Sequence, residues 1–170
     1  GATPPKDPAG LFVNPEGEVI VVTRQGVLRV EGDLSAKPRE FKVLGFKVPL
    51  GGKAGPFASI GPELPLRLAA PFATTMHPDS GALAIWNHGV LMVLERDEDG
   101  KYIRARETEF EGTKGAAVLA FAGSTLVVAL ADGRIWVIDP TDLSVRHEFR
   151  PEGKNQPRIA EASADGRWFA

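Results

Sequence analysis

The stretch 115–150 constrains the fold most, because it reads as four short strands joined by tight turns. Two apolar runs are separated by Ala122-Gly123-Ser124, and a third follows Asp132-Gly133, which is a typical hairpin turn. Pro140 lies in the next turn, where its missing N–H ends the ladder. The pattern therefore predicts strands at 117–121, 125–130, 134–138 and 143–150.

The four predicted strands differ in how many of their faces are apolar. Residues 134–138 are apolar on both pleat faces, so this strand must be covered on both sides. The last strand alternates, which predicts Leu143, Val145, His147 and Phe149 on one face and polar side chains on a wet face. Buried inner strands with a half-exposed outer strand are typical of a β-propeller blade, which lies between two neighbouring blades.

The same pattern recurs at fixed distances along the chain. The hairpin glycines Gly89 and Gly133 lie 44 residues apart, and Gly81, Gly123 and Gly166 follow each other at 42 and 43. These intervals match the ~40–45 residues of a propeller blade. We expect an all-β, incomplete ring of about three and a half four-stranded blades. The expected parts are an arm or linker at 1–10, a blade at 11–47, an inserted loop at 48–65, blades at 66–112 and 113–156, and a partial blade at 157–170.

Two segments resemble a known family. Residues 134–145, with the sequence RIWVIDPTDLSV, resemble the third strand, turn and fourth strand of bacterial YVTN-type and WD40-like β-propellers. Residues 163–167, SADGR, resemble the first turn of their blades. The chain lacks the Gly-His pair and the terminal Trp-Asp of the stricter eukaryotic WD40 pattern. The resemblance implies a propeller fold and no catalytic residue.

Composition excludes several classes of function. A net charge of −2 among 170 residues argues against an electrostatic nucleic-acid binder. Without cysteine the chain has no disulfide, no thiolate metal site and no cysteine nucleophile. The apolar run 116–131 is shorter than a membrane helix and is interrupted by Gly123, so no membrane span is predicted in this segment.

The motifs that carry chemistry elsewhere are incomplete here. Residues 95–100 imitate half of a calcium loop, but Arg106 stands where a bidentate Glu is required. Residues 51–55 are glycine-rich without the Ser/Thr and helix of a phosphate loop. We therefore predict no catalytic residue, no metal site and no cofactor. The residues expected to contact a ligand or partner are His88 and Asp132 at hairpins, and Lys53 and Phe57 in the inserted loop.

The expected function is that of a non-catalytic scaffold or binding module, as a soluble sensory or docking domain of a larger, membrane-anchored bacterial protein. The alternative is a propeller lactonase or related hydrolase with a divalent metal in the central channel, near Asn14, Asp79, Asp132 and Asp165. Expected partners are a protein or the rest of a longer chain, because three and a half blades do not close a ring. A homodimer that closes the ring is a further option. A periplasmic location fits slightly better than a cytoplasmic one.

Overall fold

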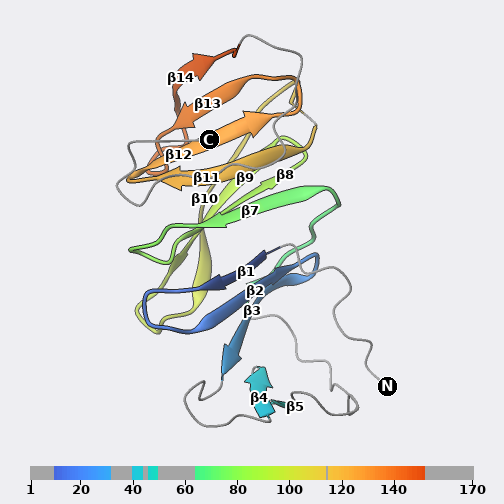
Figure 1. The fold of residues 1–170 in the computed structure, drawn as a ribbon, viewed down its shortest axis with the longest axis vertical. Helices are drawn as coiled ribbons and strands as arrows, with labels where there is room; N and C mark the ends of the chain where they lie inside the picture. Colours follow the sequence, from blue (N-terminus) through green and yellow to red (C-terminus); the bar gives the residue numbers. More distant parts are fainter. Residues whose placement is uncertain (1–9, 32–39, 44–45, 50–63, 114, 152–170) are drawn as a thin grey trace. The chain divides into compact units, whose positions relative to one another are not determined.

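The computed structural model describes residues 10–31, 40–43, 46–49, 64–113 and 115–151 (Figure 1). These residues form antiparallel sheets and turns, which confirms the all-β class. None of the described segments forms a helix long and apolar enough to cross a membrane. The chain divides into two compact units, residues 1–68 and 69–170, and each is described by itself.

Unit 1 contains a six-stranded sheet with the order β1-β2-β3-β4-β5, and β6 pairs with β3. Strand β4 lies within the expected blade at 11–47 and pairs with β3 on one side and β5 on the other. Strands β5 and β6 include the first two and last two residues of the expected inserted loop at 48–65. The bounds are Gly10–Val13 for β1, Val19–Thr23 for β2, Gly26–Glu31 for β3, Glu40–Val43 for β4, Phe46–Pro49 for β5 and Leu64–Pro65 for β6.

Unit 2 contains two four-stranded sheets, with the orders β10-β9-β8-β7 and β11-β12-β13-β14. Each is a meander, because strands that follow each other in the chain are also neighbours in the sheet. In the first sheet, β7 is Phe72–Met76, β8 is Leu83–Asn87, β9 is Val90–Arg96 and β10 is Tyr102–Glu109. In the second, β11 is Ala117–Ala122, β12 is Thr125–Leu130, β13 is Ile135–Ile138 and β14 is Val145–Phe149.

The predicted strands of 115–150 agree with β11, β12 and β13 to within one residue. The expected hairpin at His88-Gly89 is also present, between paired Asn87 and Val90. Positive φ angles of 51° at His88 and 91° at Gly89 explain why a glycine is needed at the second position.

The predicted face pattern of the last strand is wrong. Leu143 lies in the preceding turn with a φ of 59°, and it is buried there. The register of β14 shifts by one residue, so Val145 pairs with Ile138 whereas His147 pairs with Val137. This β-bulge turns Val145 away from the face of His147, and all five residues of β14 are exposed. A bulge depends on pairing with the neighbouring strand, so the alternation of the sequence does not reveal it.

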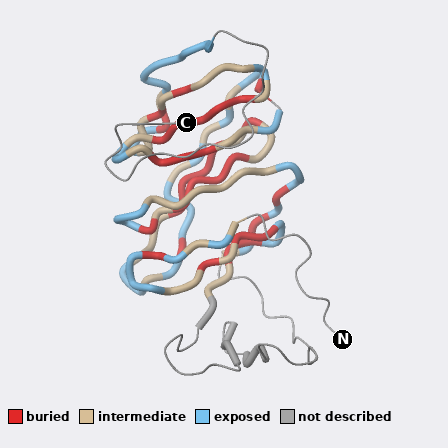
Figure 2. The backbone as a smooth tube through the Cα atoms, in the orientation of Figure 1, coloured by how far each residue is buried: buried red, intermediate tan, exposed pale blue. Residues whose placement is uncertain are grey.

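The two sheets of unit 2 pack face to face around one apolar core (Figure 2). Trp86 from β8 lies edge-on to Trp136 from β13, with ring centroids 6.3 Å apart. Phe110, just after β10, contacts both indoles. Both Trp86 and Trp136 are buried, whereas Trp168 lies outside the described residues. The cluster comprises Ala84, Trp86, Leu91 and Val93 of the first sheet, and Leu119, Phe121, Leu126, Val128, Leu130, Trp136, Ile138 and Leu143 of the second sheet and its turn.

Candidate binding surface

The predicted contact residues at hairpins are engaged in their own turns. The Nε2 atom of His88 lies 3.3 Å from the carbonyl oxygen of Ala70, just before β7. The Asp132 carboxylate accepts hydrogen bonds from the backbone N–H of Arg134 at 3.0 Å and from its guanidinium at 2.7 Å. The hydrogen bond from the Arg134 side chain is the main reason why the pKa of Asp132 lies below its ordinary value. The other two predicted contact residues, Lys53 and Phe57, lie outside the described residues.

The residues expected near a catalytic metal hold turns as well. Asn14 is only 4% exposed, and its side chain binds both the backbone N–H and the carboxylate of Glu18 at 2.7 Å. Asp79 donates its backbone N–H to the ring of His77, in the turn after β7. Within the described part of the chain, no three His, Asp or Glu side chains come together in a way that could hold a metal ion. Asp165 lies outside the described residues.

The turn between β13 and β14 is held by carboxylates and one arginine. Asp139 accepts hydrogen bonds from the hydroxyl and the N–H of Thr141, and these bonds lower its pKa to about 2. Arg146 joins this turn, with ion pairs of 2.9 Å to Asp139 and 2.8 Å to Asp142. Both carboxylates therefore stabilise the turn that leads into the bulge.

The face of the β11–β14 sheet that points away from the core is apolar across all four strands. Directly paired residues of antiparallel strands point to the same side, so the register defines two rows on this face. Only the edge of this face is open to water, because Ala120, Val127 and Ala129 on β11 and β12 are buried whereas Phe149 on β14 is 54% exposed. We call this surface the open face. Its rows are Val118, Ala129, Ile135 and Phe149, and Ala120, Val127, Val137 and His147.

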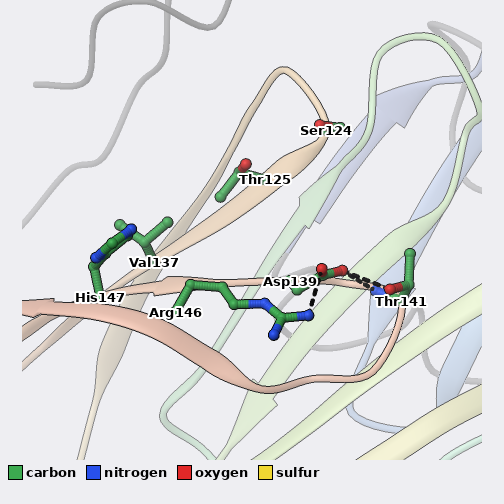
Figure 3. Close-up of a pocket in the computed structure, with 7 residues that line it drawn as sticks. All are labelled: Ser124, Thr125, Val137, Asp139, Thr141, Arg146 and His147. Atoms are coloured by element: carbon green, nitrogen blue, oxygen red, sulfur yellow. Dashed lines mark hydrogen bonds and ion pairs between the residues drawn. The ribbon is translucent and has the colours of Figure 1, made fainter.

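A hollow of about 450 Å³ lies at one end of the open face (Figure 3). His147 and Val137 line it from the sheet, and Arg146 lies beside them with its guanidinium directed toward Asp139. Its rim is polar, since the turns after β11 and β13 contribute hydroxyl groups. The polar lining residues outside the sheet rows are Ser124, Thr125, Asp139, Thr141 and Arg146.

Unit 1 carries a second exposed apolar surface, which we call the unit 1 face. On β1, Leu11 is 70% exposed and Val13 is 64% exposed, the highest values among the large apolar residues described. Leu11 pairs with Val21, which pairs with Leu28, and Val13 pairs with Val19. The unit 1 face therefore consists of Leu11, Val13, Val19, Val21 and Leu28. The opposite side of the same strands is buried at Ile20, Val22 and Val27.

Sequence reasoning missed both of these surfaces. It selected single polar residues at hairpins, whereas the exposed surfaces consist of apolar rows that cross several strands. The sequence predicts that these residues lie in strands. It does not predict which of them share a row, because that depends on the register of strand pairing, and a one-residue shift moves a side chain to the opposite face.

No known protein-family model matches the chain, and no curated protein matches it. Among solved structures, the chain is similar to a structure titled as the iodide structure of Trichoderma reesei Carbohydrate-Active Enzymes Family AA12. The TM-score is 0.49 and the sequence identity is 13%, over 82% of this chain and 37% of that chain. The chain thus spans little more than a third of the length of that protein.

Proposed function

We propose that the chain is a segment of a β-propeller whose role is to bind a protein partner, and that it catalyses no reaction. Two four-stranded meanders stacked through a shared core support the propeller, since this is how neighbouring blades pack. The outer strands β10 and β14 are the more exposed ones, as expected of blades.

One contrast supports binding over catalysis. The polar side chains that the sequence offers for chemistry are used inside turns: Asn14 binds Glu18, Asp132 binds Arg134, and Asp139 binds Thr141 and Arg146. The apolar rows of the open face, in contrast, are buried on β11 and β12 at Ala120, Val127 and Ala129 and end at the sheet edge in Phe149, which is 54% exposed. Aromatic side chains in apolar patches are the usual anchors of protein interfaces.

We further propose that this module serves as a sensory or docking domain in a larger, membrane-anchored bacterial protein. This part of the proposal rests on the resemblance of residues 134–145 and 163–167 to bacterial propeller repeats. The partner is then a protein that contacts the open face, and the hollow with its polar rim adds hydrogen-bonding groups at the edge of the contact.

The test has a binding part and a chemical part. A photo-crosslinking amino acid at position 149 identifies the protein that contacts the open face in a lysate of the source organism. The affinity of that protein is then measured for Phe149→Lys and for the control Ile103→Lys, whose side chain is 45% exposed on β10. We expect at least about tenfold weaker binding for the first variant and unchanged binding for the control.

The chemical part tests the hydrolase alternative. The purified chain is supplied with calcium or zinc, assayed for bound metal, and incubated with a panel of lactones. We expect no stoichiometric ion and no turnover. Turnover that depends on a bound ion and is lost in Asp79→Asn or Asp132→Asn would overturn the binding function in favour of the hydrolase.

A further inference from the structure

We infer that the hollow beside the turn between β13 and β14 binds a neutral, hydroxyl-rich small molecule of the sugar or polyol class. This inference goes beyond the proposed protein-binding function and does not depend on it. The volume of about 450 Å³ lies within the ~300–1,000 Å³ of small-molecule pockets. Every residue that lines the hollow is exposed or half-buried, so a ligand reaches it directly from water.

Two successive residues of β14 line this hollow, which a regular strand would not allow. Successive side chains of a strand point to opposite faces. In β14 the register shifts, because Val137 pairs with His147 whereas Ile138 pairs with Val145. Arg146 is thus the extra residue of the β-bulge, and both Arg146 and His147 line the hollow. Bulges are frequent next to active sites, where they re-aim a side chain in this way.

The turn before the bulge orients Arg146. The Nη2 atom of its guanidinium forms ion pairs of 2.9 Å with Asp139 and 2.8 Å with Asp142. Leu143 in the same turn has a φ of 59°, and residues other than glycine that are held in this conformation cluster at functional sites. The arginine is therefore in place before a ligand arrives, which reduces the entropic cost of binding.

Several hydrogen-bonding groups around the hollow have no partner, in contrast to Asp132 and Asn14 in the other turns. In the part of the chain that the structure describes, the hydroxyl groups of Ser124 and Thr125 and the ring nitrogens of His147 form no hydrogen bond. The ion pairs of the arginine use only Nη2, which leaves its Nε and Nη1 atoms as donors. Unpaired donors and acceptors from three segments thus meet at one hollow.

The charges in this turn disfavour an ionic ligand. Asp139 and Asp142 carry two negative charges and Arg146 carries one positive charge, so their sum is −1, which a protonated His147 would at most cancel. An anion therefore gains no net attraction. Both oxygens of each carboxylate already accept hydrogen bonds within the turn, so a cation would have to displace them. A neutral ligand fits these charges best.

Among neutral ligands, the lining groups favour a sugar or polyol. Hydroxyl groups and imidazole nitrogens can each donate or accept a hydrogen bond, as the hydroxyl groups of a sugar do. Val137 and His147 are paired across the two strands and lie side by side in Figure 3. Their side chains form a mainly apolar wall, against which the C–H groups of a sugar ring can pack.

The test is a titration of the full chain with glucose, galactose and maltose, followed by proton–nitrogen correlation NMR. We expect saturable shifts of the amide signals of Ser124, Val137 and Arg146, with millimolar dissociation constants because the hollow is open to water. The amide signal of His88, in a hairpin of the other sheet, should not shift. Glucuronate, the carboxylate analogue of glucose, should bind more weakly than glucose.

Two variants remove hydrogen-bonding groups from the hollow and leave the ion pairs of Arg146 in place. Thr125→Val and His147→Ala should each weaken binding of the tightest of the three sugars by about three- to tenfold, as expected for the loss of one hydrogen bond. The matched control is Thr108→Val, which changes a half-buried threonine of β10 that does not line the hollow. This control should bind the sugar like the wild type.

The inference is overturned if no saturable shift occurs with any of the three sugars up to about 50 mM, well above the millimolar constants of weak complexes. Equal affinities of Thr125→Val, His147→Ala and Thr108→Val overturn it too. Tighter binding of glucuronate than of glucose would assign the hollow to an anion instead. If His147→Ala loses the signal dispersion of a folded chain, Ser124→Ala at an exposed turn position replaces it.

Discussion

The contact between Trp86 and Trp136 is a sensitive test of how the two sheets of unit 2 pack. The two indoles come from different sheets, are 0% and 5% exposed, and lie edge-to-face. Replacing both by leucine, singly and together, gives a double-mutant cycle. The coupling free energy of this cycle reports the contact between the sheets and nothing within either sheet.

The magnitude follows from packing. Leucine is smaller than tryptophan by on the order of 60 Å³, which costs ~1.5 kcal/mol if the cavity persists at about 24 cal/mol per Å³. Each variant also loses the aromatic contacts of its indole and the hydrogen bond that the indole N–H donates, from Trp86 to the Gly115 carbonyl or from Trp136 to the Glu148 carboxylate. These losses add roughly 1 kcal/mol, because both acceptors are exposed and can bond to water instead. Each single variant should therefore lose ~2–3 kcal/mol in free energy of unfolding. The double variant should lose about 0.5–1.5 kcal/mol less than the sum.

The assay is hydrogen exchange by mass spectrometry at increasing urea concentration. Peptides from β8 and β12 report the free energy of unfolding of unit 2 by itself, independent of unit 1. Losses that add to within about 0.3–0.5 kcal/mol would mean that the two indoles do not interact. The face-to-face packing of the two sheets would then be refuted at its centre.

Two further predictions concern turns. Gly89→Ala should destabilise unit 2 by about 1 kcal/mol more than Gly133→Ala in urea unfolding. Both glycines have a positive φ, but a Cβ added at Gly89 would lie 3.3 Å from Phe110 and Thr113, whereas one added at Gly133 would meet nothing within 4 Å. Equal losses of stability in the two variants would contradict this close approach. The pKa of Asp139 is about 2, below its unfolded value, so its stabilisation is full above pH ~4 and lost as pH falls through 2. The difference in urea midpoint between wild type and Asp139→Asn should therefore shrink between pH 4 and pH 2, and a difference constant with pH would refute it.

The strands of unit 2 were predictable because their information is local. Apolar runs bounded by Gly123, Asp132-Gly133 and Pro140 mark β11, β12 and β13 without any knowledge of their partners. The hairpin at His88-Gly89 was predictable for the same reason, since a two-residue turn needs positive φ angles that glycine allows.

The apolar rows of the two surfaces were not predictable because they depend on the register of strand pairing. The bulge in β14 places Val145 and His147 on opposite faces, although the sequence alternates as if they shared one. Leu143 is buried, and it lies in a turn with a left-handed backbone conformation in which leucine is uncommon. The predicted polar contacts at His88 and Asp132 were located correctly on hairpins, but their hydrogen bonds to Ala70 and Arg134 are visible only in three dimensions.

The central claim is that the β14 edge of the open face is available to a partner while the core of unit 2 is closed. The chain has no cysteine, so single cysteines at positions 149 and 128 can be labelled without background. The rate of thiol labelling at low micromolar concentration measures access directly. We expect Phe149→Cys to react nearly as fast as a free thiol, and Val128→Cys, whose parent side chain is 0% exposed, to react only through opening of the structure. Equally slow labelling at both positions would show that the open face is already covered within the chain, and would contradict the account.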